Sequence, residues 1–161
     1  MGMQKNHRHG FTLIELVVVV VIIAIIAAIA IPKMSRGSAG AADSATSQDL
    51  STLRSALELY QTEHGGTYPS ATSAATLALQ LTTYTDNSGG TSATKDATHI
   101  YGPYLKAVPS LPVGTNKGAS TFTITGPAGT GTFGWYYDGT TFWANNPNSD
   151  VDVRGTQYNA Y

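Results

Sequence analysis

One uninterrupted apolar segment near the start of the chain limits the possible folds more than any other feature. Phe11 to Ile31 read FTLIELVVVVVIIAIIAAIAI, and Glu15 is the only charged residue among them. As a helix with a rise of about 1.5 Å per residue, this segment would span ~32 Å, close to the ~30 Å hydrocarbon core of a bilayer. Val and Ile are poor helix formers in water, but in lipid the backbone must satisfy its own hydrogen bonds and therefore forms a helix. We expect residues 11–31 to form a membrane-spanning helix.

Two simpler explanations of this segment are a secretory signal peptide and an ordinary single-pass anchor. A signal peptide has a shorter apolar region, of roughly 7–15 residues, followed by small residues at its cleavage site. Here the apolar run is longer, and Pro32, Lys33 and Met34 follow it. An ordinary anchor explains the length of the run, but it does not explain a carboxylate within the first helical turn.

Glu15 is the residue of this segment that needs a specific explanation. A carboxylate at the centre of a membrane helix costs ~2.5–3.5 kcal/mol on insertion scales. One turn from the helix start, the side chain can reach the interface, where the helix dipole also favours it. The alternative is that Glu15 meets a cation inside an assembly.

The composition argues against several functional classes. The formal net charge is -1 and charged residues make up 12% of the chain, so we expect no nucleic-acid partner. Without cysteine, neither a disulfide framework nor a thiolate metal site can form. The histidines show no paired metal-ligand spacing, and the sequence contains no Gly-x-Ser-x-Gly elbow. We therefore expect no enzyme activity.

Residues 32–65 are predicted to continue the helix in an amphipathic form. Pro32 removes a backbone donor and clashes with the preceding turn, so we expect a kink or local melting there, with the helix resuming near Asp43. Four large apolar residues then recur at helical spacing and form a stripe suited to packing on a sheet: Leu50, Leu53, Leu57 and Tyr60. Gly65-Gly66 should end the helix.

Residues 66–161 are predicted to form a globular region of loops and short strands. A short helix is expected over Ala74–Leu81 and a flexible loop over Asp86–Asp96. Polar and apolar residues alternate in Thr121–Thr125, and two aromatic runs flank the turn signal Asp138-Gly139. The sequence thus predicts an α+β fold, in which a long N-terminal helix, with its first half transmembrane, packs on a small antiparallel β-sheet.

The start of the chain resembles the class III signal of type IV pilins and type II secretion pseudopilins. The resemblance rests on Gly10-Phe11-Thr12-Leu13-Ile14-Glu15 and on the short basic leader MGMQKNHRHG before it. It implies that a prepilin peptidase removes residues 1–10 by cutting after Gly10, and then methylates the new N-terminal Phe11. It also implies that Glu15 acts in subunit docking and that Pro32, which corresponds to a helix-kinking proline, acts with it in assembly.

The implied cut would create the cation that Glu15 lacks in the membrane. Breaking the peptide bond before Phe11 leaves an α-amino group four residues from Glu15 on the same helix. We expect that amino group to pair with Glu15 of a neighbouring subunit.

A looser resemblance to the major (G-type) pseudopilin extends into the globular region. It rests on Tyr101–Lys106 (YGPYLK), with Pro109 and Pro112 after it. That family has a calcium-binding loop, and here the segment NNPNSDVD supplies the comparable oxygen atoms. Asp150 and Asp152 are its candidate ligands for Ca²⁺, which takes roughly six to eight oxygens, and the alternative is an ordinary solvated turn. No other cofactor is expected.

The resemblance implies a structural subunit of the type II secretion pseudopilus, a homopolymer that acts in protein export. The implied partners are prepilin peptidase, an inner-membrane assembly platform with its ATPase, minor pilin-like subunits, and membrane lipid before assembly. The protein would cross the bacterial inner membrane once with a cytoplasmic N-terminus, and its globular domain would be periplasmic, or extracellular in a surface pilus. One alternative is a surface type IV pilin or competence filament subunit. Another is a monomeric membrane-anchored binding protein.

Overall fold

The computed structural model describes the backbone of residues 10–126 and 131–161, and the side chains in these ranges apart from residues 31–36. The predicted leader, except for Gly10, therefore lies outside the described residues. The chain divides into two compact units after Ser38.

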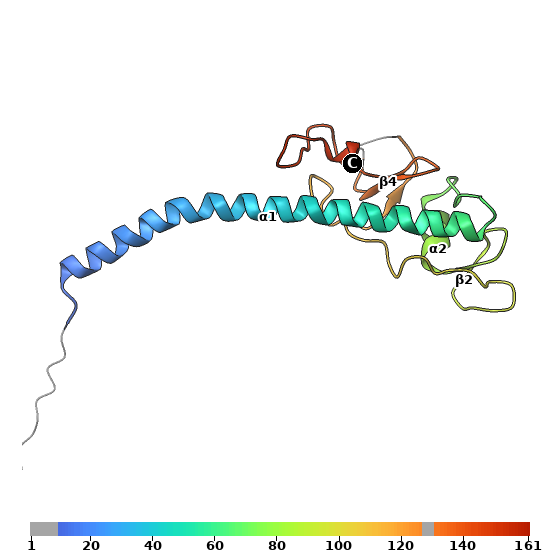
Figure 1. Cartoon of the computed structure of the whole chain (residues 1–161), viewed down its shortest axis with the longest axis horizontal. Helices are drawn as coiled ribbons and strands as arrows, with labels where there is room; N and C mark the ends of the chain where they lie inside the picture. The colour runs from blue at the N-terminus through green and yellow to red at the C-terminus, as the bar shows by residue number, and fades with distance from the viewer. Residues whose placement is uncertain (1–9, 127–130) are drawn as a thin grey trace, which may run out of the picture. The chain divides into compact units, whose positions relative to one another are not determined.

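One long helix, α1 (Leu13–Glu63), contains both the apolar and the amphipathic segment (Figure 1). The helix is continuous through Pro32 and through the glycines that follow it, so the expected local melting and the restart near Asp43 are wrong. A proline deletes one hydrogen bond of the helical ladder. The hydrogen bonds of neighbouring turns remain, and the alanines that precede Asp43 favour helix. The kink at Pro32 stays a prediction.

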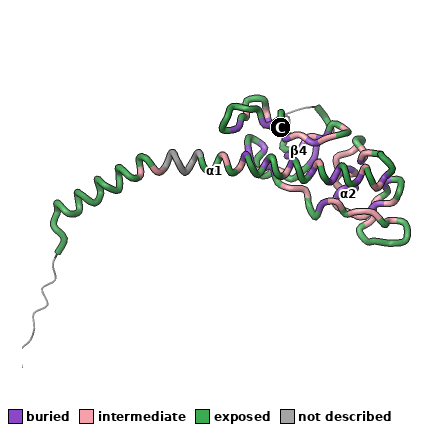
Figure 2. The backbone as a smooth tube through the Cα atoms, viewed as in Figure 1, coloured by how far each residue is buried: buried purple, intermediate pink, exposed green. Residues whose placement is uncertain are grey.

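The N-terminal part of α1 exposes its apolar residues. Leu13–Ala30 is an 18-residue window with a mean hydropathy of 3.3, of which 0% is buried. Figure 2 shows most of this segment in green, the colour of exposed residues. Among residues 10–126 and 131–161 it is the one helix long and apolar enough to cross a membrane, which is consistent with the predicted single-pass membrane protein.

The C-terminal part of α1 supplies one wall of the hydrophobic core. All four residues of the predicted stripe are buried. They share one cluster with side chains from a second helix and from the sheet: Leu77, Leu81, Phe122, Trp135, Tyr137 and Phe142. Arg54 adds a polar connection, because its guanidinium donates to the carbonyl of Phe142 at 2.9 Å and to that of Tyr161 at 2.7 Å.

Glycine ends α1 as predicted, and a short helix follows. Gly65 and Gly66 have φ angles of 63° and 91°, a left-handed conformation that favours glycine. The N–H of Gly66 donates to the carbonyl of Gln61 at 2.8 Å. The second helix, α2 (Ala74–Thr82), begins after Ser73, whose side chain caps it.

Within the described residues, five short strands form two small sheets. In the first sheet, β1 (Tyr84–Thr85) pairs antiparallel with β2 (Thr91–Ser92). The second has the order β3 (Phe122–Thr123), β4 (Trp135–Tyr137), β5 (Phe142–Ala144).

The second sheet contains the predicted hairpin but is mixed and not purely antiparallel. The β4–β5 pair is antiparallel around Asp138-Gly139, whereas β3 runs parallel to β4. Parallel strands cannot be joined by a tight hairpin turn, and β3 is accordingly separated from β4 by more of the chain than β4 is from β5. The predicted α+β class is confirmed.

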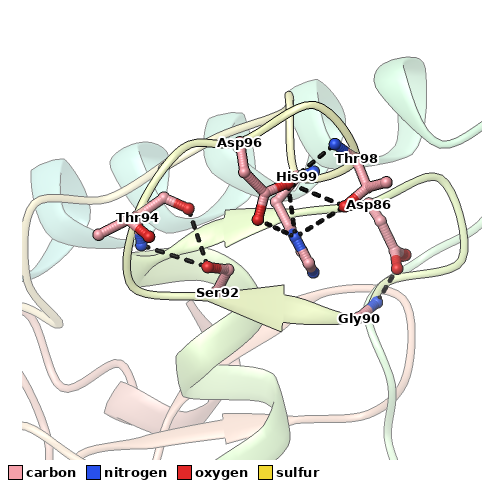
Figure 3. A network of polar contacts seen from close by, with 7 residues as sticks. All are labelled: Asp86, Gly90, Ser92, Thr94, Asp96, Thr98 and His99. Atoms are coloured by element: carbon pink, nitrogen blue, oxygen red, sulfur yellow. Dashed lines mark hydrogen bonds and ion pairs between the residues drawn. The ribbon is translucent and has the colours of Figure 1, made fainter.

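Residues 86–96, which include β2, are held by hydrogen bonds where the composition predicted a flexible loop. The Oδ1 atom of Asp86 accepts the N–H of Gly90 at 2.9 Å, and that of Asp96 accepts the N–H of His99 at 2.8 Å (Figure 3). Oδ2 of Asp96 lies 2.9 Å from Nδ1 of His99. Backbone hydrogen bonds, led by Gly90 and His99 respectively, hold the pKa of both carboxyls below its usual range. The carboxylates of Asp86 and Asp96 thus take the place of water as hydrogen-bond acceptors for the backbone N–H groups of these turns.

Leu53→Ala is expected to lower the free energy of unfolding of the globular unit by about 2–5 kcal/mol, because it opens a cavity in the core. Leu53 is 0% exposed, whereas Leu59 on the same helix is 50% exposed. Leu59→Ala is the matched control and should change stability by no more than about 0.5 kcal/mol. Chemical denaturation of the protein in detergent measures both values. Equal effects of the two substitutions would contradict the packing described for α1.

Candidate processing and assembly site

The candidate site is the start of α1, where Gly10, Phe11 and Glu15 follow one another closely. Gly10 and Phe11 precede the helix and are exposed. A Cβ atom added to Gly10 would meet no atom within 4 Å. The peptide bond predicted to be cut, between Gly10 and Phe11, is therefore not covered by residues 10–126 or 131–161.

Thr12 and Glu15 form a reciprocal cap on the first turn of α1. The carbonyl of Thr12 accepts the N–H of Leu16 at 3.3 Å, which makes Thr12 the N-cap residue. Oε2 of Glu15 accepts the N–H of Thr12 at 2.8 Å and its hydroxyl at 2.7 Å, while Oγ1 of Thr12 accepts the N–H of Glu15 at 3.3 Å. This arrangement is a capping box. Sequence reasoning missed Thr12, although Thr-x-x-Glu before an apolar run is the signature of that motif.

The capping box satisfies part of the hydrogen-bonding capacity of Glu15. Both Thr12 donors reach Oε2, and within the part of the chain that the structure describes no side chain or backbone group donates to Oε1. The Thr12 N–H belongs to the peptide bond after Phe11, so a cut after Gly10 would leave both donors in place. One carboxylate oxygen of Glu15 is thus bound locally by Thr12, and the other accepts no hydrogen bond from the described residues.

Pro32, the other residue predicted to act in assembly, lies well away from this cap. It stands 17 positions after Glu15 in α1, which corresponds to roughly 25 Å along a helix. The structure therefore does not bring Pro32 together with Gly10, Phe11 or Glu15.

Asp152, a candidate calcium ligand, is surrounded by hydrogen-bond donors. It is 5% exposed and accepts the hydroxyl of Tyr161 at 2.6 Å and the N–H groups of Arg154 and Thr156 at 2.7 and 2.8 Å. Nε of Arg154 lies 3.3 Å from its Oδ2 atom. These contacts, with the Tyr161 hydroxyl first, lower the pKa of Asp152 to about 2.

Several other oxygen atoms of the predicted calcium segment also have protein partners. Oδ2 of Asp150 accepts the N–H of Thr115 at 2.5 Å. Asn145 and Asn146 are buried, and Oδ1 of Asn146 accepts the N–H of Asn116 at 3.2 Å. Among the described residues, no group of three or more His, Asp or Glu is placed to hold a metal ion. This arrangement does not fit calcium, which requires oxygen acceptors converging on one point.

Comparison with known proteins bears on the start of α1. Residues 5–31 match the family model of the prokaryotic N-terminal methylation motif. The match includes the predicted cleavage site, the capping box and the apolar part of α1. No curated protein and no solved structure matches the chain significantly. Over its N-terminal segment the chain is thus similar to proteins with this methylation motif, which supports a type IV pilin-like, membrane-anchored protein.

Proposed function

We propose that this protein is a structural subunit of a pilus-like filament, and more specifically of the pseudopilus of a type II secretion system. The observation that carries the proposal is the start of α1, where the methylation motif leads into an apolar helix with 0% of its 18-residue span buried. A bilayer covers such a helix in the stored subunit. After extraction from the bilayer, the same surface must pack against other apolar helices to stay out of water.

The proposed docking step uses the cut after Gly10. The cut produces an α-amino group on Phe11, and this cation approaches Oε1 of Glu15 in a neighbouring subunit. The capping box holds the Glu15 side chain in one orientation through Oε2, so less side-chain entropy is lost on docking. Because each subunit contributes one amino group and one carboxylate, the contact is head-to-tail and repeats along a filament.

The assignment to secretion is supported by the loop similar to that of the major pseudopilin, Tyr101–Lys106. In this loop Tyr104 donates its hydroxyl to Glu63 of α1 at 2.7 Å, so the loop is held against the end of the long helix. The partners of this proposal are prepilin peptidase, the inner-membrane assembly platform with its ATPase, and minor pilin-like subunits.

A deletion strain tests the proposal. We expect the strain to lose exported proteins from the culture medium while electron microscopy finds its surface fibres unchanged. Loss of surface fibres with unchanged export would assign the protein to a surface type IV pilus or competence filament instead. In wild-type cells, protein that keeps residues 1–10 and forms no multimers on cross-linking would overturn every filament assignment.

A further inference from the structure

Asp43 connects α1 to the C-terminal loop, which we define as residues 145–161. Asp43 is a charged residue that is only 5% exposed. Its Oδ1 atom accepts the hydroxyl of Tyr158 at 2.6 Å, and its Oδ2 atom accepts the N–H of Val153 at 3.0 Å. A buried carboxylate is costly unless donors satisfy it, and here both oxygens have a donor from the loop.

Asp152 repeats this arrangement within the loop itself. Its carboxylate also binds one tyrosine hydroxyl, that of Tyr161, together with backbone N–H groups. The rings of Tyr158 and Tyr161 meet edge to face with their centroids 5.8 Å apart. Two buried carboxylates and two contacting tyrosines therefore form one connected cluster between α1 and the loop.

The chemistry of this cluster is opposite to that of a calcium site. Backbone N–H groups point their hydrogens at Asp43 and Asp152, and an N–H group cannot turn around to become an acceptor. The guanidinium of Arg154 already supplies a positive charge next to Asp152. A calcium ion at Asp152 would have to displace these donors and then find several further oxygens.

We propose that the C-terminal loop is held closed on α1 by the Asp43–Tyr158 and Asp152–Tyr161 pairs, and that calcium takes no part in this closure. Asp43 positions the loop on α1, because it is the member of the cluster that belongs to the helix. The inference does not depend on the proposed filament function.

Hydrogen exchange of the full-length protein in detergent micelles tests the proposal, with calcium chloride or the chelator EDTA as the two conditions. We expect the wild-type loop to exchange equally slowly in both conditions, with the same melting temperature. Asp43→Asn should speed exchange over residues 150–161 about tenfold in both conditions, because a buried carboxylate acceptor is lost. Asp49→Asn, on the same helix, is the control and should leave loop exchange unchanged.

Two results would overturn the proposal. One is slower loop exchange or a higher melting temperature of the wild type in calcium, with that response absent in Asp152→Asn. The other is an Asp43→Asn protein whose loop stays as protected as in the wild type. Tyr158→Phe removes only a hydroxyl, so it serves as a milder variant if Asp43→Asn fails to fold, and it too should speed loop exchange. Protection of residues 84–101 reports in each variant whether the rest of the domain is folded.

Discussion

Gly10→Val is expected to leave residues 1–10 attached to the membrane-inserted protein and to abolish filament formation. A branched side chain at this exposed position stands directly at the bond that the peptidase must reach. Without the cut, Phe11 has no α-amino group, so the cation proposed to meet Glu15 does not exist. Intact-mass measurement of the membrane fraction should find the full-length precursor without a methyl group on Phe11.

Gly10→Val should not change the fold of the chain. A Cβ atom at Gly10 meets no atom within 4 Å, and the same is true at Gly37. Gly37→Ala is therefore the control, and its product should be cut, methylated and assembled. If Gly10→Val protein were found at the leader-free mass, the predicted cleavage site would be wrong.

Glu15→Ala is expected to insert into the membrane and to be processed normally, but not to assemble. Insertion should not suffer, because removing a carboxylate from a membrane helix lowers its transfer cost. Docking would bury the α-amino group of Phe11 without its partner. Such an unpaired buried charge costs about 3–5 kcal/mol, or about two to four orders of magnitude in the affinity of each subunit contact. Membrane fractionation and the yield of sheared filaments measure the two properties separately.

Thr12→Val separates the docking role of Glu15 from its role in the capping box. The substitution removes the Thr12 hydroxyl but keeps Glu15 and the Thr12 N–H, so it should cost only about 0.5–2 kcal/mol of local helix stability. We expect Thr12→Val filaments to form. If Thr12→Val and Glu15→Ala lost assembly to the same extent, the cap and not the contact between subunits would explain the defect.

Features that depend on a short sequence window could be predicted. The stripe from Leu50 to Tyr60 has helical spacing, and its burial follows from that spacing alone. The β4–β5 hairpin follows from two aromatic runs around an Asp-Gly turn. The first turn of α1 is equally local, and its Thr-x-x-Glu signature was available in the sequence.

Features that depend on distant parts of the chain could not be predicted. The hydrogen bond between Asp43 and Tyr158 joins residues 115 positions apart, and no local pattern encodes it. The acidic and amide residues near the C-terminus indicated oxygen ligands by composition, but composition does not tell whether a cation or an N–H group faces those oxygens. The parallel pairing of β3 with β4 likewise depends on the path of the connection between them.

The two hydrogen bonds that Arg54 donates affect how the globular unit would respond to a pulling force. One terminal nitrogen of its guanidinium binds the carbonyls of Phe142 in β5 and of Tyr161 in the C-terminal loop, so the helix, the sheet and the loop meet at a single side chain. A pulling force that acts on Arg54 would therefore reach Phe142 of β5 and Tyr161 of the loop through the same side chain. These two hydrogen bonds would then share the load in parallel.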